Sequence, residues 1–180
     1  MSMRRLPQGY LITPAAPEDV ADLVFTDLAA SKLFAGTGYL PEEALADHVP
    51  VTTLEAAIPT GHIFAVHHKG AAVGFALTSV RGTSLYLDQL SVDPAHGRRG
   101  LGAALMARVL QDARRRRLKW VTLSTFRDLA WNGPFYRRLG FRELPDAQLQ
   151  GWMREINAVQ MANGLDVSKR CFMIRRTRWL

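Results

Sequence analysis

The spacing of apolar residues along the chain predicts helices and strands in a definite order. From Val20 to Leu33 the apolar positions recur every three or four residues, which is the period of a helix with one buried face. Pro17, followed by two acidic residues, opens this stretch and Gly36 closes it. We therefore expect a helix over about residues 17–36.

Shorter apolar runs predict strands. Three of them, at residues 62–68, 71–80 and 84–92, are separated only by tight turns that contain Gly70 and Gly82. This arrangement predicts an antiparallel meander. Further strands are predicted at residues 10–15, 119–126 and 170–177.

The remaining periodic segments predict helices. A long amphipathic helix is expected over residues 100–117 and another over 146–164, and shorter helical pieces are expected at 41–49, 53–61 and 131–141. Neither a repeat nor a long linker interrupts this order. The sequence thus predicts one α/β (α+β) domain over residues 1–180, with helices on the faces of a mixed sheet.

Charge narrows the classes of partner. The formal net charge is +7 and the pI is about 10.2, which favours an anionic partner such as nucleic acid, a membrane surface or a phosphorylated cofactor. The basic run from Arg114 to Lys119 predicts either a solvated helix end or a phosphate contact. We expect no membrane partner, because no apolar stretch approaches the ~20 residues of a membrane span and no signal-peptide core follows the N-terminal charges. The single cysteine, Cys171, excludes an internal disulfide and fits a cytoplasmic location.

The turn between residues 93 and 105 combines features of an anion site. Its sequence is DPAHGRRGLGAAL, and it connects a predicted strand to a predicted helix. A helix N-terminus offers unpaired N–H groups, glycines let a ligand approach the backbone, and Arg98 and Arg99 add positive charge. The spacing matches neither a P-loop nor a dinucleotide-binding fingerprint. A glycine-rich helix start with incidental arginines is the alternative interpretation.

Three stretches together resemble a known family, the GCN5-related N-acetyltransferases (GNAT). They read LDQLSVDPAHGRRGLGAALM, WVTLSTF and WNGPFYRRLGF. The family signature Q/R-x-x-G-x-G/A corresponds to residues 97–102, although its first position here is Gly97. Its second feature, an Asn with a Tyr four residues on and then Gly-Phe, corresponds to Asn132, Tyr136 and Gly140-Phe141. The resemblance is close over residues 62–143 and loose over 9–35, and residues 146–178 correspond to the variable C-terminal part.

The resemblance implies a fold and a co-substrate. The fold would be a twisted, mostly antiparallel mixed sheet whose fourth and fifth strands, at residues 84–92 and 119–126, splay apart around acetyl-CoA. The pantetheine would pair with the backbone of Leu90, Ser91 and Val92, and Asn132 would contact the cofactor. The pyrophosphate would bind the N–H groups of residues Arg98, Arg99, Gly100, Leu101, Gly102 and Ala103.

The resemblance also implies direct attack of an amine on the thioester carbonyl. A backbone N–H near Leu90 would stabilise the oxyanion. Tyr136 would protonate the leaving thiolate, and its alternative role is that of a plain core aromatic. Asn132 is also placed to cap a helix.

The proton acceptor has several candidates. Asp88 stands within the apolar run LYLDQL, where a carboxylate is costly unless it is paired or lies in a cleft. It is therefore either a general base with a raised pKa or a structural carboxylate. His62, His67 and His68 are expected to be solvated edge residues, with a proton relay as the alternative, and water could also carry the proton. No zinc pattern is present, so no metal is expected.

The acceptor is least defined by the sequence. Residues 33–61 correspond to the usual acceptor region of the family, and their acids, Glu42, Glu43, Asp47 and Glu55, are either a cation-attracting surface or a solvated face. The second half of the 146–164 helix would form a pocket wall, a homodimer contact or simply a core stripe. A small-molecule amine is the expected acceptor, and a peptide or protein amine is the alternative.

Two other functions are compatible with this chain. A non-catalytic acyl-CoA-binding module would use the same fold, because fold does not fix function. Nucleic-acid binding fits the charge, but the sequence contains no helix-turn-helix, RRM or zinc pattern, so we expect no nucleic-acid partner.

Overall fold

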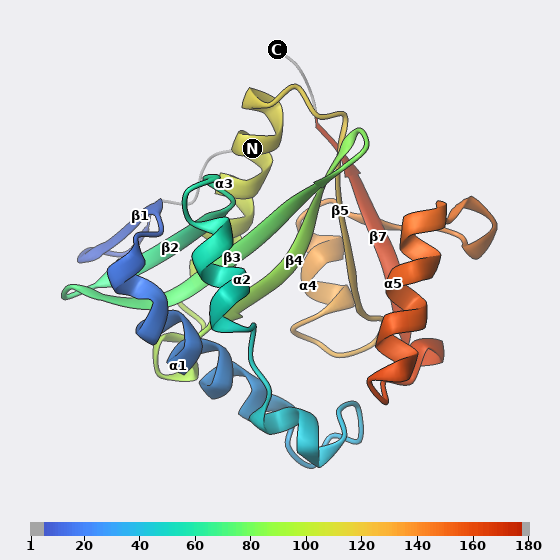
Figure 1. Ribbon diagram of the computed structural model, residues 1–180, viewed down its shortest axis with the longest axis horizontal. Helices are drawn as coiled ribbons and strands as arrows, with labels where there is room; N and C mark the ends of the chain where they lie inside the picture. The colour runs from blue at the N-terminus through green and yellow to red at the C-terminus, as the bar shows by residue number, and fades with distance from the viewer. Residues whose placement is uncertain (1–5, 178–180) are drawn as a thin grey trace.

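The computed structural model describes residues 6–177 and contains one seven-stranded sheet within that range (Figure 1). Its strand order is β1-β2-β3-β4-β5-β7-β6. All neighbouring strands are antiparallel except β4 and β5, which are parallel. The predicted meander and the three other predicted strands are confirmed. The strands are β1 (Tyr10–Pro14), β2 (Ile63–His68), β3 (Ala71–Arg81), β4 (Ser84–Val92), β5 (Trp120–Phe126), β6 (Arg142–Glu143) and β7 (Arg170–Arg176).

Strand β6 was not predicted, because a strand of two residues is too short to produce an alternating pattern. The predicted variable C-terminal part ends at residue 178, which lies outside the described residues.

Most helices lie within their predicted bounds but are shorter. The helices are α1 (Val20–Ser31), α2 (Val51–Ala57), α3 (Leu101–Arg115), α4 (Gly133–Arg138) and α5 (Gly151–Ala162). Helix α2 begins two residues before its predicted start, and the piece expected at 41–49 is a 3-10 helix, Glu42–Ala46. The helix expected over residues 17–36 is an α-helix with one 3-10 turn at each end, Pro17–Asp19 and Lys32–Phe34. The helix expected over 146–164 is wrong in its first part, because Leu149 and Gln150 have extended backbone with ψ angles of 129° and 163°.

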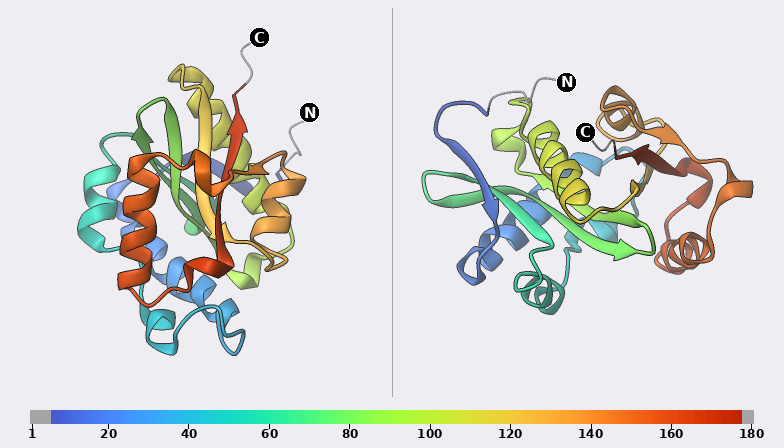
Figure 2. Two further views of the ribbon diagram at one scale, coloured as in Figure 1. Left: turned by 90° about the vertical axis from the view of Figure 1, so that its right-hand side faces the viewer. Right: turned by 90° about the horizontal axis from the view of Figure 1, so that it is seen from above.

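Two helical layers cover the sheet, α3 and α4 on one face and α1, α2 and α5 on the other (Figures 1 and 2). Helix α3 contributes Leu105, Met106 and Val109, none of which is exposed, to the core beneath β2–β5. On the opposite face, α1 and α2 pack against β3, while α5 packs against β7 and Tyr86 of β4. The sheet is thus packed against a core on each face, and its central strands β4 and β5 carry the candidate site.

The predicted splaying of the fourth and fifth strands is confirmed. The parallel pairing of β4 with β5 runs from Ser84 with Trp120 to Leu87 with Leu123 and stops there. Beyond that point β5 continues to pair with β7, while β4 continues to pair with β3. The register of β4 against β3 also shifts at this place, since Thr78 pairs with Leu87 and Leu77 with Gln89. Asp88 is therefore the extra residue of a β-bulge at the point where the wedge opens.

Candidate functional site

The turn before α3 has the backbone conformation of an anion cradle. Arg98 and Gly100 have left-handed φ angles of 56° and 79°. Within residues 6–177, the N–H groups from Arg98 to Ala103 donate to no backbone carbonyl, and the first intrahelical bond runs from Ala104 to Gly100 at 3.0 Å. Successive free N–H groups at a helix start attract an anion. The exposed side chains of Arg98 and Arg99 add two positive charges there.

Glycines at this turn serve different purposes. A Cβ on Gly97, at the position where the family pattern has Gln or Arg, would approach the carbonyl oxygen of Pro94 to 3.0 Å, so a larger residue would require a small shift of the turn. A Cβ on Gly102 would lie 3.5 Å from the ring of Phe135, which is ordinary van der Waals contact between α3 and α4. Leu101 is buried in the core, so only its N–H group is available to a ligand.

The opened edge of β4 lies next to this turn. From Asp88 to Val92, β4 is paired only with β3 among the described strands, which leaves the backbone edge that faces β5 without a strand partner. Leu90 and Val92 pack against the α3 core, whereas Ser91 points to the other face and is 2% exposed. The edge can therefore bind an extended ligand only through its backbone groups.

Tyr136 belongs to α4 and lies in the core on the α3 face of the sheet. Its ring packs with Phe135 and Phe141, with centroid distances of 5.0 and 5.8 Å, so it is part of the core. Burial raises the pKa of its hydroxyl above the ordinary value, and the positive charge of Arg170 opposes that rise. The hydroxyl is therefore protonated at neutral pH, as a proton donor must be. Both expected roles, core aromatic and acid, are compatible with this placement.

Asn132 precedes α4 but does not cap it with its side chain, so that expectation was wrong. Its backbone carbonyl accepts the N–H of Tyr136 at 3.1 Å. Its side-chain Oδ1 accepts the hydroxyl of Thr125 in β5 at 2.7 Å instead. The amide is thereby fixed against the end of β5, beside the opened wedge, where a ligand of the wedge would meet it.

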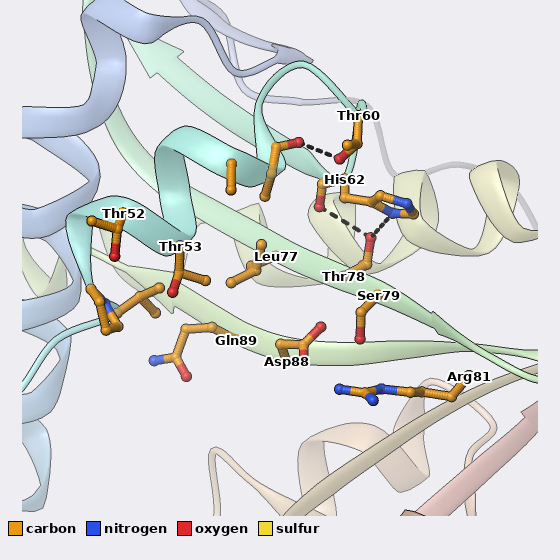
Figure 3. Close-up of a pocket in the computed structure, with 14 residues that line it drawn as sticks. Thr52, Thr53, Thr60, His62, Leu77, Thr78, Ser79, Arg81, Asp88 and Gln89 are labelled. Carbon is orange, nitrogen blue, oxygen red and sulfur yellow. Dashed lines mark hydrogen bonds between the residues drawn. The ribbon is translucent and has the colours of Figure 1, made fainter.

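A cavity of about 630 Å³ adjoins the bulge, between α2 and strands β3 and β4 (Figure 3). Asp88 and Gln89 of β4 both line it, together with Arg81 at the end of β3 and His62 before β2. The other lining residues are small, hydroxyl-bearing or apolar: Val49, Pro50, Thr52, Thr53, Ala56, Ala57, Thr60, Leu77, Thr78 and Ser79.

Asp88 is exposed on the cavity side and surrounded by protein on its other sides. Desolvation raises the pKa of its carboxyl, and the nearby Ser79 hydroxyl and Arg81 guanidinium reduce that rise. A carboxylate with these properties can accept a proton more readily than an ordinary surface carboxylate.

The histidines are not solvated edge residues, so that expectation was wrong. Strand β1 covers the edge at which they were expected. His67 Nε2 lies 2.9 Å from Asp19 Oδ1, and the ring of His68 stacks on Tyr10. His62 does line the cavity, with Nδ1 3.3 Å from the hydroxyl of Thr78. Burial and the charge of Arg116 lower its pKa, so it is neutral at neutral pH.

Acids expected near the acceptor lie elsewhere. Glu42, Glu43, Asp47 and Glu55 are all exposed, and none of them lines the cavity.

The basic run is mainly structural at its centre, because Arg115 and Arg116 each donate to the buried carboxylate of Asp112 at 2.6 Å. Arg116 continues to the carbonyl oxygen of Gly61, which ties the end of α3 to the segment before β2.

Sequence reasoning missed the buried carboxylate of Asp27 in α1. Its Oδ1 accepts Gln89 Nε2 at 2.7 Å and Ser91 Oγ at 2.6 Å, and its Oδ2 accepts the N–H of Val49 at 2.8 Å. It therefore connects β4, directly after the bulge, to the segment that opens α2. Its position four residues after the fully buried Leu23, on the same helix face, was the available signal.

Comparisons with known proteins agree with this geometry. A family model described as the acetyltransferase (GNAT) family matches residues 30–141. Among solved structures, the fold is similar to that of the PaiA N-acetyltransferase from Thermoplasma acidophilum in complex with coenzyme A (TM-score 0.73, 14% identity, 93% of this chain and 98% of that one). It is also similar to the ribosomal-protein-S18-alanine N-acetyltransferase from Escherichia coli (TM-score 0.66, 17% identity, 95% and 96%).

A further similar structure is N-acetylglutamate synthase from Neisseria gonorrhoeae (TM-score 0.72, 18% identity). The match covers 94% of this chain but only 35% of that enzyme, so the chain spans about a third of its length. Within residues 6–177, no helix is long and apolar enough to cross a membrane, and no cluster of three or more His, Cys, Asp or Glu residues could hold a metal ion.

Proposed function

This chain belongs to the GNAT acetyltransferase family, and from that premise we propose that it transfers the acetyl group of acetyl-CoA to a primary amine of a small molecule. The observation that carries the proposal is the meeting of three features at one wedge. These are the free N–H groups before α3, the unpaired edge of β4 beyond Leu87, and the protonated hydroxyl of Tyr136. The first two are the groups that a coenzyme A molecule requires, and the third is needed only for chemistry.

The residues present fit acetyl-CoA. The N–H groups from Arg98 to Ala103 would bind its pyrophosphate, with help from the side chains of Arg98 and Arg99. The backbone of Leu90, Ser91 and Val92 would pair with its pantetheine in the way that a further strand would. Asn132 would bind through its amide nitrogen, since its oxygen is already bonded to Thr125. When bound, acetyl-CoA supplies an activated acyl group as a thioester.

The chain's own residues would move two protons. The amine nitrogen forms a bond to the acetyl carbon, and the carbon–sulfur bond breaks. In this proposal Asp88 would take the proton that the amine loses, and Tyr136 would give a proton to the leaving sulfur. A backbone N–H near Leu90, at the opened edge of β4, would stabilise the oxyanion between these two steps.

The cavity beside the bulge is the proposed acceptor site, because Asp88 lines it. Its volume of about 630 Å³ lies within the range of small-molecule sites; α2 walls it on one side, and it is open toward solvent. A peptide amine is the alternative acceptor. The single domain over residues 1–180, the cytoplasmic location and the homodimer stay predictions.

Two measurements test the proposal. Calorimetric titration with acetyl-CoA should give micromolar affinity, and a short DNA duplex should bind far more weakly at the same ionic strength. Release of the coenzyme A thiol should then be measured with a panel of small amines, amino acids and short peptides. No acetyl-CoA binding would refute the enzyme, and turnover confined to peptides would refute the small-molecule acceptor. Tight acetyl-CoA binding without any turnover would favour a non-catalytic binding module.

A further inference from the structure

Arg170, the first residue of β7, is a cation that has no acidic partner within residues 6–177. Its Nε donates to Gln160 Oε1 at 3.0 Å, and its Nη2 donates to the carbonyl oxygen of Ser124 at 3.1 Å. Its guanidinium carbon lies 4.5 Å from the centre of the Phe126 ring. One edge of the guanidinium is thus held by neutral groups, while Nη1 makes no hydrogen bond to the described residues.

The position of Arg170 places this charge at the wedge. Arg170 is opposite Phe126, the last residue of β5, at the end where β5 has left β4. Phe172, two residues on, packs against α5, so Arg170 faces the same side of the sheet. Tyr86 of β4 faces that side too, and the charge of Arg170 counteracts the rise in pKa that burial causes at Tyr86 and Tyr136. The guanidinium therefore lies on the α5 face of the sheet, at the end of β5 that has separated from β4.

An uncompensated charge in this place has a cost. Desolvation lowers the pKa of the Arg170 guanidinium, which means that its surroundings disfavour the charged form. The strands themselves do not need this charge, because β5 and β7 pair at every position from Trp120 to Phe126. The bonds to Ser124 and Gln160 require only a neutral donor. A ligand that carries the missing negative charge would explain the arginine.

The geometry of the group indicates which anion it would bind. An arginine presents a planar fork of N–H donors that matches a carboxylate, and here the fork is fixed on one edge and free on the other. A second arginine, Arg81, lines the cavity on the same face and makes no ion pair among the described residues. The positive charges of both arginines oppose the rise that burial causes in the pKa of Tyr86. Among the described residues, Asp88 is the one acid whose charge adds to that rise.

We propose that Arg170 binds a carboxylate of the acceptor, so that the acceptor is a small molecule that carries both an amine and a carboxylate, as an amino acid does. This inference rests on the proposed function. The amine would approach Asp88 and the thioester, while the carboxylate would bind the free edge of the Arg170 guanidinium. A peptide N-terminus has an amide in place of the α-carboxylate and would leave the charge unpaired.

The first test compares two substrates on the unchanged protein. An amino acid and its primary amide share the amine and the side chain but differ in the carboxylate. The acid should have the higher kcat/KM, by roughly tenfold to a hundredfold, which is the range for a charge-assisted hydrogen-bonded pair. Equal kcat/KM values for acid and amide across the panel would overturn the proposal without affecting the acetyltransferase assignment.

The second test uses Arg170→Gln, which removes the charge but keeps a polar side chain with an NH₂ donor. It should raise KM for the acid about tenfold or more, leave KM for the amide and the affinity for acetyl-CoA unchanged, and so abolish the preference. Arg170→Lys should restore part of it. Arg114→Gln, an exposed arginine at the far end of α3, is the matched control and should change neither KM. An equal loss for acid and amide would overturn the proposal, because it would mean a structural role.

Calorimetry with N-acetylated amino acids in the presence of coenzyme A tests the same contact without turnover. The acid product should bind the unchanged protein at least tenfold more tightly than its amide, and Arg170→Gln should remove the difference. If this preference is found although no amine is acetylated, the proposed function fails while the carboxylate site stands. If acid and amide bind alike, the carboxylate site is refuted.

Discussion

Replacement of Asp27 tests whether one buried carboxylate holds β4 and the segment before α2 together at the cavity. Asp27→Ala would remove the acceptor of three donors, namely Ser91 Oγ, Gln89 Nε2 and the N–H of Val49. Only Ser91 is fully buried among the three donor residues, so its hydroxyl would lose its partner without gaining water. Gln89 and Val49 are partly exposed and would recover part of their bonding from solvent.

The magnitude follows from these three contacts. A hydrogen bond to a charged group contributes about 1.5–3 kcal/mol, and the two partly exposed donors would lose the smaller share. We therefore expect the free energy of unfolding to fall by about 3–5 kcal/mol. For a chain of this length that corresponds to a decrease in Tm on the order of 10 °C. Asp27→Asn should also be destabilising, because one of its two polar atoms is a donor and would face a donor.

Chemical denaturation would measure the stability, and initial rates would measure the function. At a temperature where the variant is folded, Asp27→Asn should raise KM for the acceptor more than it raises Kd for acetyl-CoA, because Gln89 and Val49 line the cavity. Glu18→Gln, an exposed acid before the same helix, is the control and should change neither quantity by much. A loss of stability below about 1 kcal/mol would refute the reasoning, since the network would then contribute no more than a surface contact.

Three further predictions concern the reaction itself. Tyr136→Phe should lower turnover tenfold or more while acetyl-CoA affinity is retained, and unchanged turnover would exclude the hydroxyl as acid. Gly100→Val should abolish acetyl-CoA binding, because φ at this position is +79°, where a β-branched residue is strained. Gly38→Val, at a φ of +72° away from the turn, is the control and should leave the affinity normal. Normal affinity in both variants would exclude the cradle. The rate should fall as pH decreases through the pKa of the base, and the raised pKa of Asp88 puts this fall above the range of an ordinary carboxyl. Asp88→Asn should remove this limb of the pH profile and His62→Gln should not, and the opposite result would assign the proton to His62.

Local patterns were sufficient to predict most of the fold, and they supplied the candidate residues for the cofactor side of the proposed site. The turn before α3 and the spacing of Asn132 and Tyr136 are each encoded within about a dozen residues, so they can be recognised in the sequence. The contacts of Asp27 with Ser91 and of Arg170 with Ser124 join residues 64 and 46 positions apart. No local period indicates such pairs, because they depend on which helix packs on which strand.

The bulge in β4 explains why the acceptor side was harder to predict. In a regular strand, side chains alternate between the two faces, so Asp88 and Gln89 would point in opposite directions. The extra residue at Asp88 allows both to line one cavity and leaves Leu90 facing α3. The same irregularity stands where β5 separates from β4, so the wedge for the co-substrate and the cavity for the acceptor begin at the same residue. One inserted residue thus puts the expected base at the junction of the two proposed binding sites.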